Sequence, residues 1–415
     1  MKKIFNIFLM ALTATSCANS GSEPRPNTAQ ANQDTVKTVG ATLGSFAYDL
    51  NFLKTHDSAL VHLRRGDAQL LASAQYQGKV FTSTADGLNG HSFGWVNYRA
   101  FEGAPGLHMN AYGGENRLWL GPEGGKFSLF FHPGAKMEFS NWKTPPGFDS
   151  EPWELASQND TVVSFRKNLL LINYAGTTLS IRIDRAVTLL DNRAIDSLLN
   201  IHLSGAVRAV GYRTENGITN TGSRAWDETT GMPCIWMLDM FPPTDSTTIV
   251  APFKPGTLPA ATTDYFGKIP LDRLRYRDGA LFFKADGKKR GKLGVHPNRA
   301  LPMAGSYDAV RHILTIILYD QDPLGRYLNQ EWNTAKPPFS GDAMNAYNDG
   351  PLADGTQMGP FYELESVGAA AFLPPGHKAT HWHSVFHFTG PDPALDAIAR
   401  SCLSTSLQTI TTIFH

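Results

Sequence analysis

Cysteine is scarce in this sequence, with three residues in 415 and no CxxC pair. Zinc ribbons and dithiol redox sites depend on such pairs, so the sequence contains neither motif. Cys234 lies in an apolar run, which is typical of a small core residue. Cys234 and Cys402 have the option of forming one disulfide in an oxidising compartment, and the sequence leaves this pairing open.

Net charge and cofactor motifs are missing as well. Lys+Arg and Asp+Glu both total 37, so the formal net charge is zero and nothing predicts binding to nucleic acid or to an anionic surface. The glycine pairs at 113–114 and 124–125 are followed by neither a GK[ST] triplet nor a helix, so they form no phosphate loop. The stretch 341–350 lacks the alternating oxygen ligands and distal Glu of a calcium loop. We expect no cofactor.

No apolar run is long enough to span a membrane as a helix. The longest candidate, from Ile4 to Leu12, follows two lysines and precedes Cys17. This N-terminus resembles a bacterial lipoprotein signal, with Cys17 as the lipidated residue and residues 18–35 as a flexible tether. The resemblance implies a protein held by its lipid on the periplasmic side of the cell envelope, at the outer membrane. An ordinary cleaved secretion signal is the alternative.

Short alternating runs, separated by many of the 38 glycines and 26 prolines, fill the rest of the chain. They predict an all-β fold of consecutive antiparallel strands, with a short helix within 42–56 and another at Pro393–Leu403. We expect one domain over 36–390 and a C-terminal helix and tail over 391–415. The strands expected between the early helix and residue 320 are Ala59–His62, Ala68–Ala72, Lys79–Thr84, Lys126–Phe131, Val162–Arg166, Leu169–Tyr174, Leu179–Leu189, Leu198–Leu203, Arg208–Arg213, Cys234–Met240, Thr248–Pro252, Ala280–Lys284, Lys292–Val295 and Ala309–Leu318.

The densest cluster of ionisable residues lies in Gly359–Phe388, which reads as a strand, a Pro/Gly turn and a return strand. Glu363 and Glu365 are two apart and share one face, while His381, His383 and His387 share a face of the return run. On neighbouring strands such groups are costly to bury unless they are paired or used. Alternate histidines with a Glu can bind zinc, but hydrogen-bonded histidines are the commoner case, and we expect no metal.

A second informative stretch is Leu107–Phe127, in which Glu115, Arg117 and Trp119 alternate onto one predicted face. A carboxylate and a guanidinium bind hydroxyls by directed hydrogen bonds, and an indole stacks on a pyranose ring. This combination predicts a sugar site. A buried Glu–Arg pair over a core Trp is the alternative.

Four motifs together resemble the galactose mutarotase-like superfamily, closest to a branch of secreted bacterial lipoproteins. They are HMNAYGGENRLWLGPEGG, ENGITNTG, SYDAVRHILTI and FYELES followed by FLPPG and HSVFHF. In aldose 1-epimerases a Leu-Glu-Ser-like triplet precedes a Pro-Gly turn and the terminal strand, and Leu364-Glu365-Ser366 matches that order. The resemblance implies a β-supersandwich of two large antiparallel sheets, with few short helices and a sugar cleft on a concave face.

The resemblance also implies residue roles. Glu365 would be the general base, and a histidine the acid. This chain has Asn220-Thr221 where epimerases carry Asn-His, so His108, His381 and His383 are the candidate acids, of which His108 and His383 are preferred. The residues expected to bind the sugar are Glu115, Arg117, Trp119, Asn220, Asn345, Tyr347, Glu363 and His381.

These observations predict a periplasmic, carbohydrate-active protein with epimerase-like acid/base chemistry on a monosaccharide or oligosaccharide. Two alternatives stay open. One is a saccharide-binding lipoprotein without catalysis. The other is a polysaccharide lyase or hydrolase on the same fold, in which two carboxylates cooperate.

Overall fold

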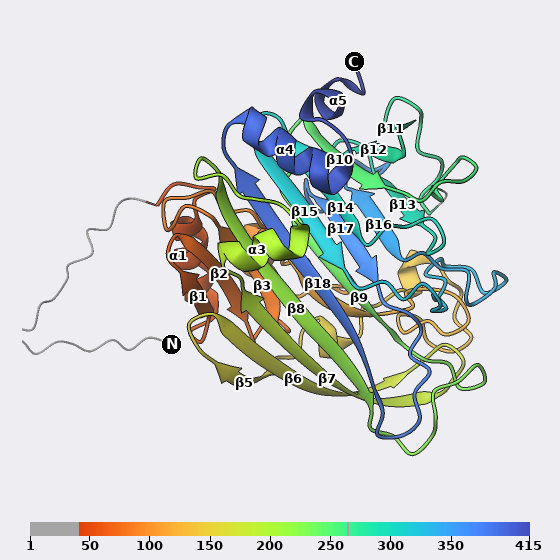
Figure 1. Cartoon of the computed structure of the whole chain (residues 1–415). Coiled ribbons are helices and arrows are strands. Elements are labelled where there is room, and N and C mark those ends of the chain that lie inside the picture. Colours follow the sequence, from red (N-terminus) through yellow and green to blue (C-terminus); the bar gives the residue numbers. More distant parts are fainter. Residues whose placement is uncertain (1–40, 264) are drawn as a thin grey trace, which may run out of the picture. The chain divides into compact units, whose positions relative to one another are not determined.

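The computed structural model describes residues 41–263 and 265–415, in which strands dominate the regular structure. The described strands form antiparallel sheets of ten, five and three strands, accompanied by few, short helices (Figure 1). The predicted all-β supersandwich with two large antiparallel sheets is confirmed. The predicted signal peptide, the whole predicted tether and Cys17, the predicted lipidation site, lie outside the described residues. Among the described residues, no helix is both long enough and apolar enough to cross a membrane.

The ten-stranded sheet runs, in spatial order, through β11 (Leu274–Arg277), β12 (Ala280–Lys284), β10 (Thr247–Pro252), β14 (Met303–Asp308), β15 (Ile313–Tyr319), β18 (Lys378–Thr389), β8 (Arg208–Asn220), β7 (Thr178–Leu189), β6 (Val162–Ile172) and β5 (Glu154–Gln158). The five-stranded sheet has the order β13 (Gly291–Val295), β16 (Met344–Asn348), β17 (Tyr362–Val367), β9 (Cys234–Phe241) and β4 (Arg117–Gly121). The three-stranded sheet contains β1 (Val61–Arg65), β2 (Ala68–Ser73) and β3 (Lys79–Thr84).

The helices are α1 (Phe46–His56), α2 (Tyr98–Glu102), α3 (Asn192–Leu199), α4 (Asp392–Leu403) and α5 (Leu407–Thr412), with two 3₁₀ turns, η1 (Phe139–Asn141) and η2 (Pro146–Phe148). Helix α1 falls within the predicted early helix, and α4 coincides with the predicted C-terminal one. Helix α5 was not predicted. It begins after Ser406, whose hydroxyl accepts from the Thr409 N–H, and it buries Leu407 and Ile410.

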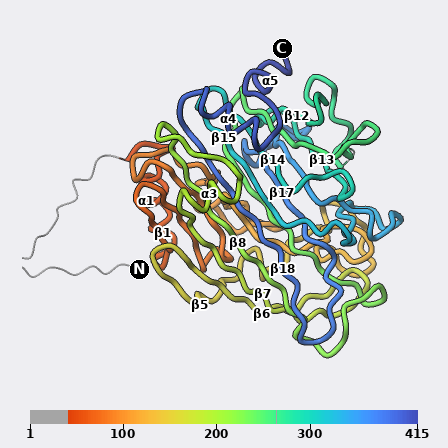
Figure 2. Tube along the Cα trace, in the orientation of Figure 1, coloured from red at the N-terminus to blue at the C-terminus, as the bar shows by residue number. Residues whose placement is uncertain are grey.

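The main core lies between the ten-stranded and the five-stranded sheets. Strand β7 alternates strictly between buried and half-exposed residues, and its buried Ile181 and Ile183 join one cluster with Leu118, Met237 and Leu364 of the five-stranded sheet. This period of two is what places one face of a strand in the core. Strand β18 runs beside β8 over its whole length, although their first residues, Arg208 and Lys378, are 170 positions apart in the sequence (Figure 2).

A second apolar cluster covers the opposite face of the ten-stranded sheet. Leu395, Ile398 and Leu403 of α4 pack there against Ile316 and Phe386 of the strands beneath. Helix α4 lies across the blue and cyan strands in Figure 1. The C-terminal helices therefore close this face of the sandwich.

Two predicted strands are wrong. Residues 126–131 form a loop, whose alternating Phe127, Leu129 and Phe131 are buried without any strand pairing. Leu198 lies in helix α3, which begins after Asp191, because the Asp191 carboxylate accepts from the Ala194 N–H.

Two further predictions have shifted boundaries. The expected strand over 309–318 begins in the turn between β14 and β15, where His312 has a positive φ of 52°, and only its part from residue 313 onward belongs to β15. The expected pair Val162–Arg166 and Leu169–Tyr174 is one continuous strand, β6. In each case the apolar pattern predicts a strand in the right place, but a local turn, or its absence, decides where that strand begins and ends.

Candidate functional site

Strand β17 carries the two acids to the face of the five-stranded sheet that points away from the ten-stranded sheet, here called the outer face. Glu363 and Glu365 alternate with Leu364, which is in the core. The strand register puts further polar and aromatic side chains on the same face. These are Arg117, Trp119, Trp236, Lys292, Asn345 and Tyr347.

Glu365 is fully buried, and its carboxylate is held from one side. Its Oε2 accepts from the Trp236 Nε1–H at 2.8 Å and from the Lys292 Nζ at 2.9 Å. Its Oε1 accepts no hydrogen bond from any residue that the structure describes. A buried carboxylate with one satisfied and one free oxygen is fixed in orientation and still able to take a proton.

Glu363 pairs with Arg117. The Arg117 Nη2 donates to Glu363 Oε1 at 2.8 Å, and the guanidinium lies 4.8 Å from the centre of the Trp119 ring. Burial raises the pKa of Glu363 to about 7, and the neighbouring Glu365 carboxylate adds to this, while Arg117 opposes it. Glu363 is therefore poised to exchange a proton near neutral pH.

Lys292 from β13 is the central cation of the outer face. Burial alone would lower its pKa, but the carboxylates of Glu365, Glu123 and Glu363 together raise it. Its Nζ also lies 4.8 Å from the Trp236 ring centre. Lys292 thus stays charged and offsets the buried acids.

Tyr265 lies beside this cation. Its hydroxyl donates to Asp342 Oδ2 at 2.6 Å and accepts from Asn345 Nδ2 at 3.3 Å, and its ring centre lies 5.7 Å from the Lys292 Nζ. Burial raises the pKa of Asp342 to about 6. The sequence carries no motif that marks Lys292 or Tyr265 as a residue of the site. Only the strand register and the packing of a distant loop bring them to Glu365.

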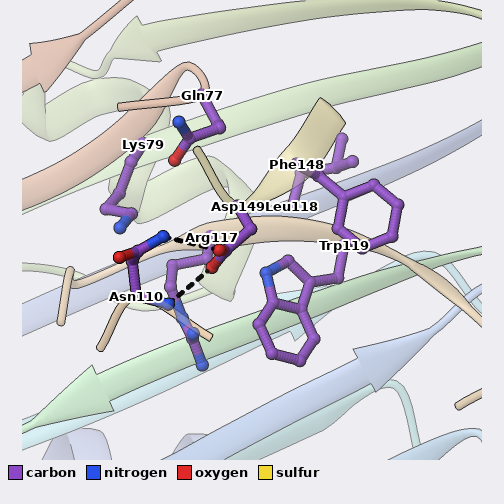
Figure 3. Close-up of a pocket in the computed structure, with 8 residues that line it drawn as sticks. All are labelled: Gln77, Lys79, Asn110, Arg117, Leu118, Trp119, Phe148 and Asp149. Carbon is purple, nitrogen blue, oxygen red and sulfur yellow. Dashed lines mark hydrogen bonds between the residues drawn. The ribbon is translucent and has the colours of Figure 1, made fainter. Parts of the chain in front are cut away.

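Aromatic rings border the outer face on the side of β4. Trp119 meets Trp236 edge-on at 5.7 Å between ring centres, and it also packs beside Phe130, Trp142 and Phe148. Next to Trp119 and Arg117 is a small cavity of about 10 Å³, room for roughly one water molecule. Figure 3 shows the side chains around it, with the amino end of Lys79 and the amide of Asn110 on one side and Trp119 on the other.

The three histidines lie elsewhere. β17 and β18 belong to different sheets, so the expectation of neighbouring strands is wrong. His383 bonds Asp239 at 2.7 Å through Nε2 and Ser366 at 2.8 Å through Nδ1, and Ser366 also contacts His381 Nε2 at 2.8 Å. Because Ser366 and Asp239 are on the inner face of the five-stranded sheet, the structure does not bring His381 or His383 to Glu365.

The other predicted residues divide in the same way. Glu115 faces inward, where its Oε1 bonds Ser83 at 2.7 Å and His387 at 3.1 Å, so the expectation that it shares a face with Arg117 is wrong. Asn220 ends β8, and its amide donates to the backbone carbonyls of Arg224 and Leu373. His108 donates from Nδ1 to the Trp142 carbonyl at 2.7 Å, beside the aromatic rings. Arg117, Trp119, Asn345, Tyr347, Glu363 and Glu365 are together on the outer face.

The described residues contain neither a cluster of potential metal ligands nor a disulfide. In residues 41–263 and 265–415, no group of three or more His, Cys, Asp or Glu is placed to hold a metal ion. Cys234 and Cys402 are both buried free thiols, so the disulfide left open by the sequence is not formed. Burial raises the pKa of each thiol to about 12.

Residues 44–414 match a family described as "Family of unknown function (DUF6786)". The chain belongs to this family. The match covers the sandwich and both C-terminal helices of this DUF6786 protein. No curated protein matches the chain.

Solved structures similar to this DUF6786 protein include the Slr1438 protein from Synechocystis sp. PCC 6803, with 14% identity, 80% of this chain and 96% of that chain covered and a TM-score of 0.49. A galactose mutarotase-like protein from Lactobacillus casei ATCC 334 has 10% identity, coverage of 79% and 100%, and a TM-score of 0.47. A galactose mutarotase related enzyme from Lactobacillus acidophilus has 8% identity, coverage of 80% and 97%, and a TM-score of 0.43. Two of these three names are mutarotase-like, as is the superfamily that the sequence motifs resemble.

Proposed function

We propose that this protein binds a sugar ring on the outer face of the five-stranded sheet and interconverts its anomers, with Glu365 as the base. The observation that carries the proposal is the free Oε1 of a buried, oriented Glu365 carboxylate beside Lys292 and Trp236. In this reaction the base takes the proton of the anomeric hydroxyl while an acid protonates the ring oxygen, and the bond between the anomeric carbon and the ring oxygen breaks to give the open-chain aldehyde. The ring hydroxyl then adds to the other face of the aldehyde, and both protons return to the groups that exchanged them.

The rest of the outer face supports a sugar ligand. Trp119 and Trp236, which are buried at 6% and 2% exposure, are the rings against which the apolar side of a pyranose would pack. Arg117, Asn345 and Tyr347 offer donors and acceptors for hydroxyl groups. A saccharide site usually combines a few aromatic rings with a small number of charged and polar groups.

We propose Glu363 as the acid. Its pKa of about 7 leaves a proton to donate near neutral pH. Two residues apart on one strand, Glu363 and Glu365 are roughly 7 Å from each other along the chain, which suits groups that act on two oxygens of one ring. His108, the histidine beside the aromatic rings, is the alternative acid.

A saccharide-binding protein without catalysis is the second candidate. It is favoured by the placement of His381 and His383, because the described residues bring neither imidazole to the outer face. In that reading Glu365 is an acceptor for sugar hydroxyls and does not exchange a proton with them.

Binding and turnover by the purified full-length protein separate these two functions. We expect calorimetry to show saturable binding of at least one aldose from a panel of monosaccharides and oligosaccharides. We also expect polarimetry to show that the protein speeds the approach of that aldose to anomeric equilibrium. Binding without faster equilibration would select the second candidate, and a panel with no bound member would reject both.

We further propose that the protein is anchored by a lipid at Cys17 on the periplasmic side of the cell envelope. The support is the sequence alone, with its basic start, short apolar run and Cys17. In cells fed labelled palmitate, we expect label on the wild-type protein and none on Cys17→Ala. Cys402→Ala is the matched control and should keep the label. Equal labelling of Cys17→Ala and wild type would remove the anchor.

A further inference from the structure

Lys79, the first residue of β3, is a buried lysine without a carboxylate partner. It is 6% exposed, and no Asp or Glu oxygen of the described residues lies in ion-pair contact with it. Its Nζ lies instead 5.3 Å and 5.6 Å from the ring centres of Phe81 and Tyr112. Burial lowers the pKa of Lys79 to about 7, with Arg117 adding to the effect and Asp149 opposing it. An ammonium group here would be stabilised by an anion.

Arg117 brings a second cation to the same place. Its Nη2 donates a hydrogen bond to Glu363 Oε1, but its buried Nε has no hydrogen-bond partner in the described part of the chain. Lys79 and Arg117 both line the cavity of about 10 Å³, together with Gln77, Asn110 and Asp149. Figure 3 shows their polar ends gathered around it.

The acids nearby leave these cations incompletely compensated. Asp149 accepts from Asn110 through both oxygens, at 2.9 Å from the backbone N and 2.7 Å from Nδ2. Glu363, with its pKa near 7, is only partly ionised at neutral pH. Arg117 is a full cation in this cavity, Lys79 with its pKa of about 7 is partly protonated at neutral pH, and the one carboxylate beside them is committed, so the cavity suits a further negative oxygen, which would favour the protonated lysine.

A glycine makes room for this arrangement. Gly114 has a φ of +123°, and a Cβ on it would lie 2.4 Å from Lys79 Cδ. The missing side chain therefore allows the lysine stem to pass along the backbone and reach the cavity. Gly114, the second residue of a glycine pair that forms no phosphate loop, acquires a function in this way.

We propose that the cavity between Lys79 and Arg117 receives the carboxylate of a uronic acid whose ring lies on the outer face. The inference deepens the proposed function, on which it rests, by naming acidic sugars as the substrate class. The size of the cavity favours a carboxylate, because one of its oxygens fills about the space of one water molecule, whereas a phosphate ester presents three terminal oxygens. Arg117 donates to the sugar from Nε and keeps its bond to Glu363.

Calorimetry on the full-length protein tests the proposal with glucuronate, galacturonate, glucose, galactose and glucose 6-phosphate. We expect a uronate to bind at least about tenfold more tightly than its neutral parent, since a charge-assisted hydrogen bond contributes more than a neutral one. Lys79→Met should lower the affinity for that uronate about tenfold and leave the affinity for the neutral sugar unchanged. Lys288→Met, which removes an exposed lysine paired with Asp245, should change neither.

The outcomes separate the two proposals. Neutral sugars that bind as tightly as uronates would overturn the carboxylate site and leave the sugar-binding function intact. Tighter binding of glucose 6-phosphate would overturn it as well, and absence of binding to all five would reject both. Thermal unfolding reports on folding, and Lys79→Met should not lower the Tm, since it removes an unpaired buried charge. If Lys79→Met fails to fold, Lys79→Gln takes its place. The ratio of the wild-type affinities for the uronate and for its neutral parent then serves as the second measurement.

Discussion

Replacement of Glu365 by glutamine is expected to slow anomer interconversion by about 10²–10⁴-fold while sugar binding survives. The amide cannot accept the proton of the anomeric hydroxyl. Its carbonyl oxygen can still accept from the Trp236 Nε1–H and the Lys292 Nζ, now 2.8 Å and 2.9 Å from Glu365 Oε2, so the surroundings keep their arrangement. The measurement is the initial polarimetric rate at saturating aldose, with calorimetry on the same sample for binding.

Three variants measured beside it make this result interpretable. Glu154→Gln changes an exposed acid on β5 and should leave the rate unchanged. Glu363→Gln should lose rate and also lose the fall in rate above about pH 7 that the wild type owes to deprotonation of its acid. If His108 is the acid, His108→Gln should lower the rate and Glu363→Gln should leave it unchanged. Undiminished interconversion by a folded Glu365→Gln protein would reject Glu365 as the base.

Most of the fold was predictable because local patterns decide it. Strict alternation in β7, the alternating run of β3 and the short apolar runs of β9 and β12 predicted those strands nearly to the residue. The errors come from residues whose burial has another cause. The aromatic residues of 126–131 are buried by a loop that packs on the core, and periodicity cannot distinguish such a loop from a strand.

The candidate site was predictable only in its local part. The i, i+2 spacing placed Glu363 with Glu365 and Arg117 with Trp119, and the strand register then joined the two pairs. The same spacing failed at Glu115, because the chain enters β4 only at Arg117. Pairing between sheets is not encoded in spacing. β17 and β18 follow each other in sequence yet belong to different sheets, so the histidines of β18 face the inner side of the five-stranded sheet and not its outer face. Lys292 reaches Glu365 because β13 pairs with β16 and β16 with β17, an order of strands that spacing does not encode.

The largest expected effect on stability belongs to Lys292→Met. Methionine has a similar length but removes the cation that lies 2.9 Å from Glu365 Oε2 in a buried site. The carboxylate would then have to stay charged without its partner or take up a proton. Because a free Glu ionises near pH 4.3, holding that proton at pH 7 costs roughly 3–4 kcal/mol, which limits the loss. We expect the free energy of unfolding at pH 7 to fall by about 3 kcal/mol, measured by urea denaturation.

A double-mutant cycle shows whether this loss comes from the pair or from packing. In Glu365→Gln/Lys292→Met no unpaired charge is left between positions 365 and 292, so the double variant should be more stable than Lys292→Met alone and the coupling energy should reach about 2–3 kcal/mol. The loss in Lys292→Met should also shrink at pH 5, where a carboxyl group is protonated at little cost. Lys288→Met, which breaks an exposed pair with Asp245, should unfold at the urea midpoint of the wild type. A coupling energy near zero would mean that Lys292 contributes packing only, and Glu365 would then need another source of its orientation.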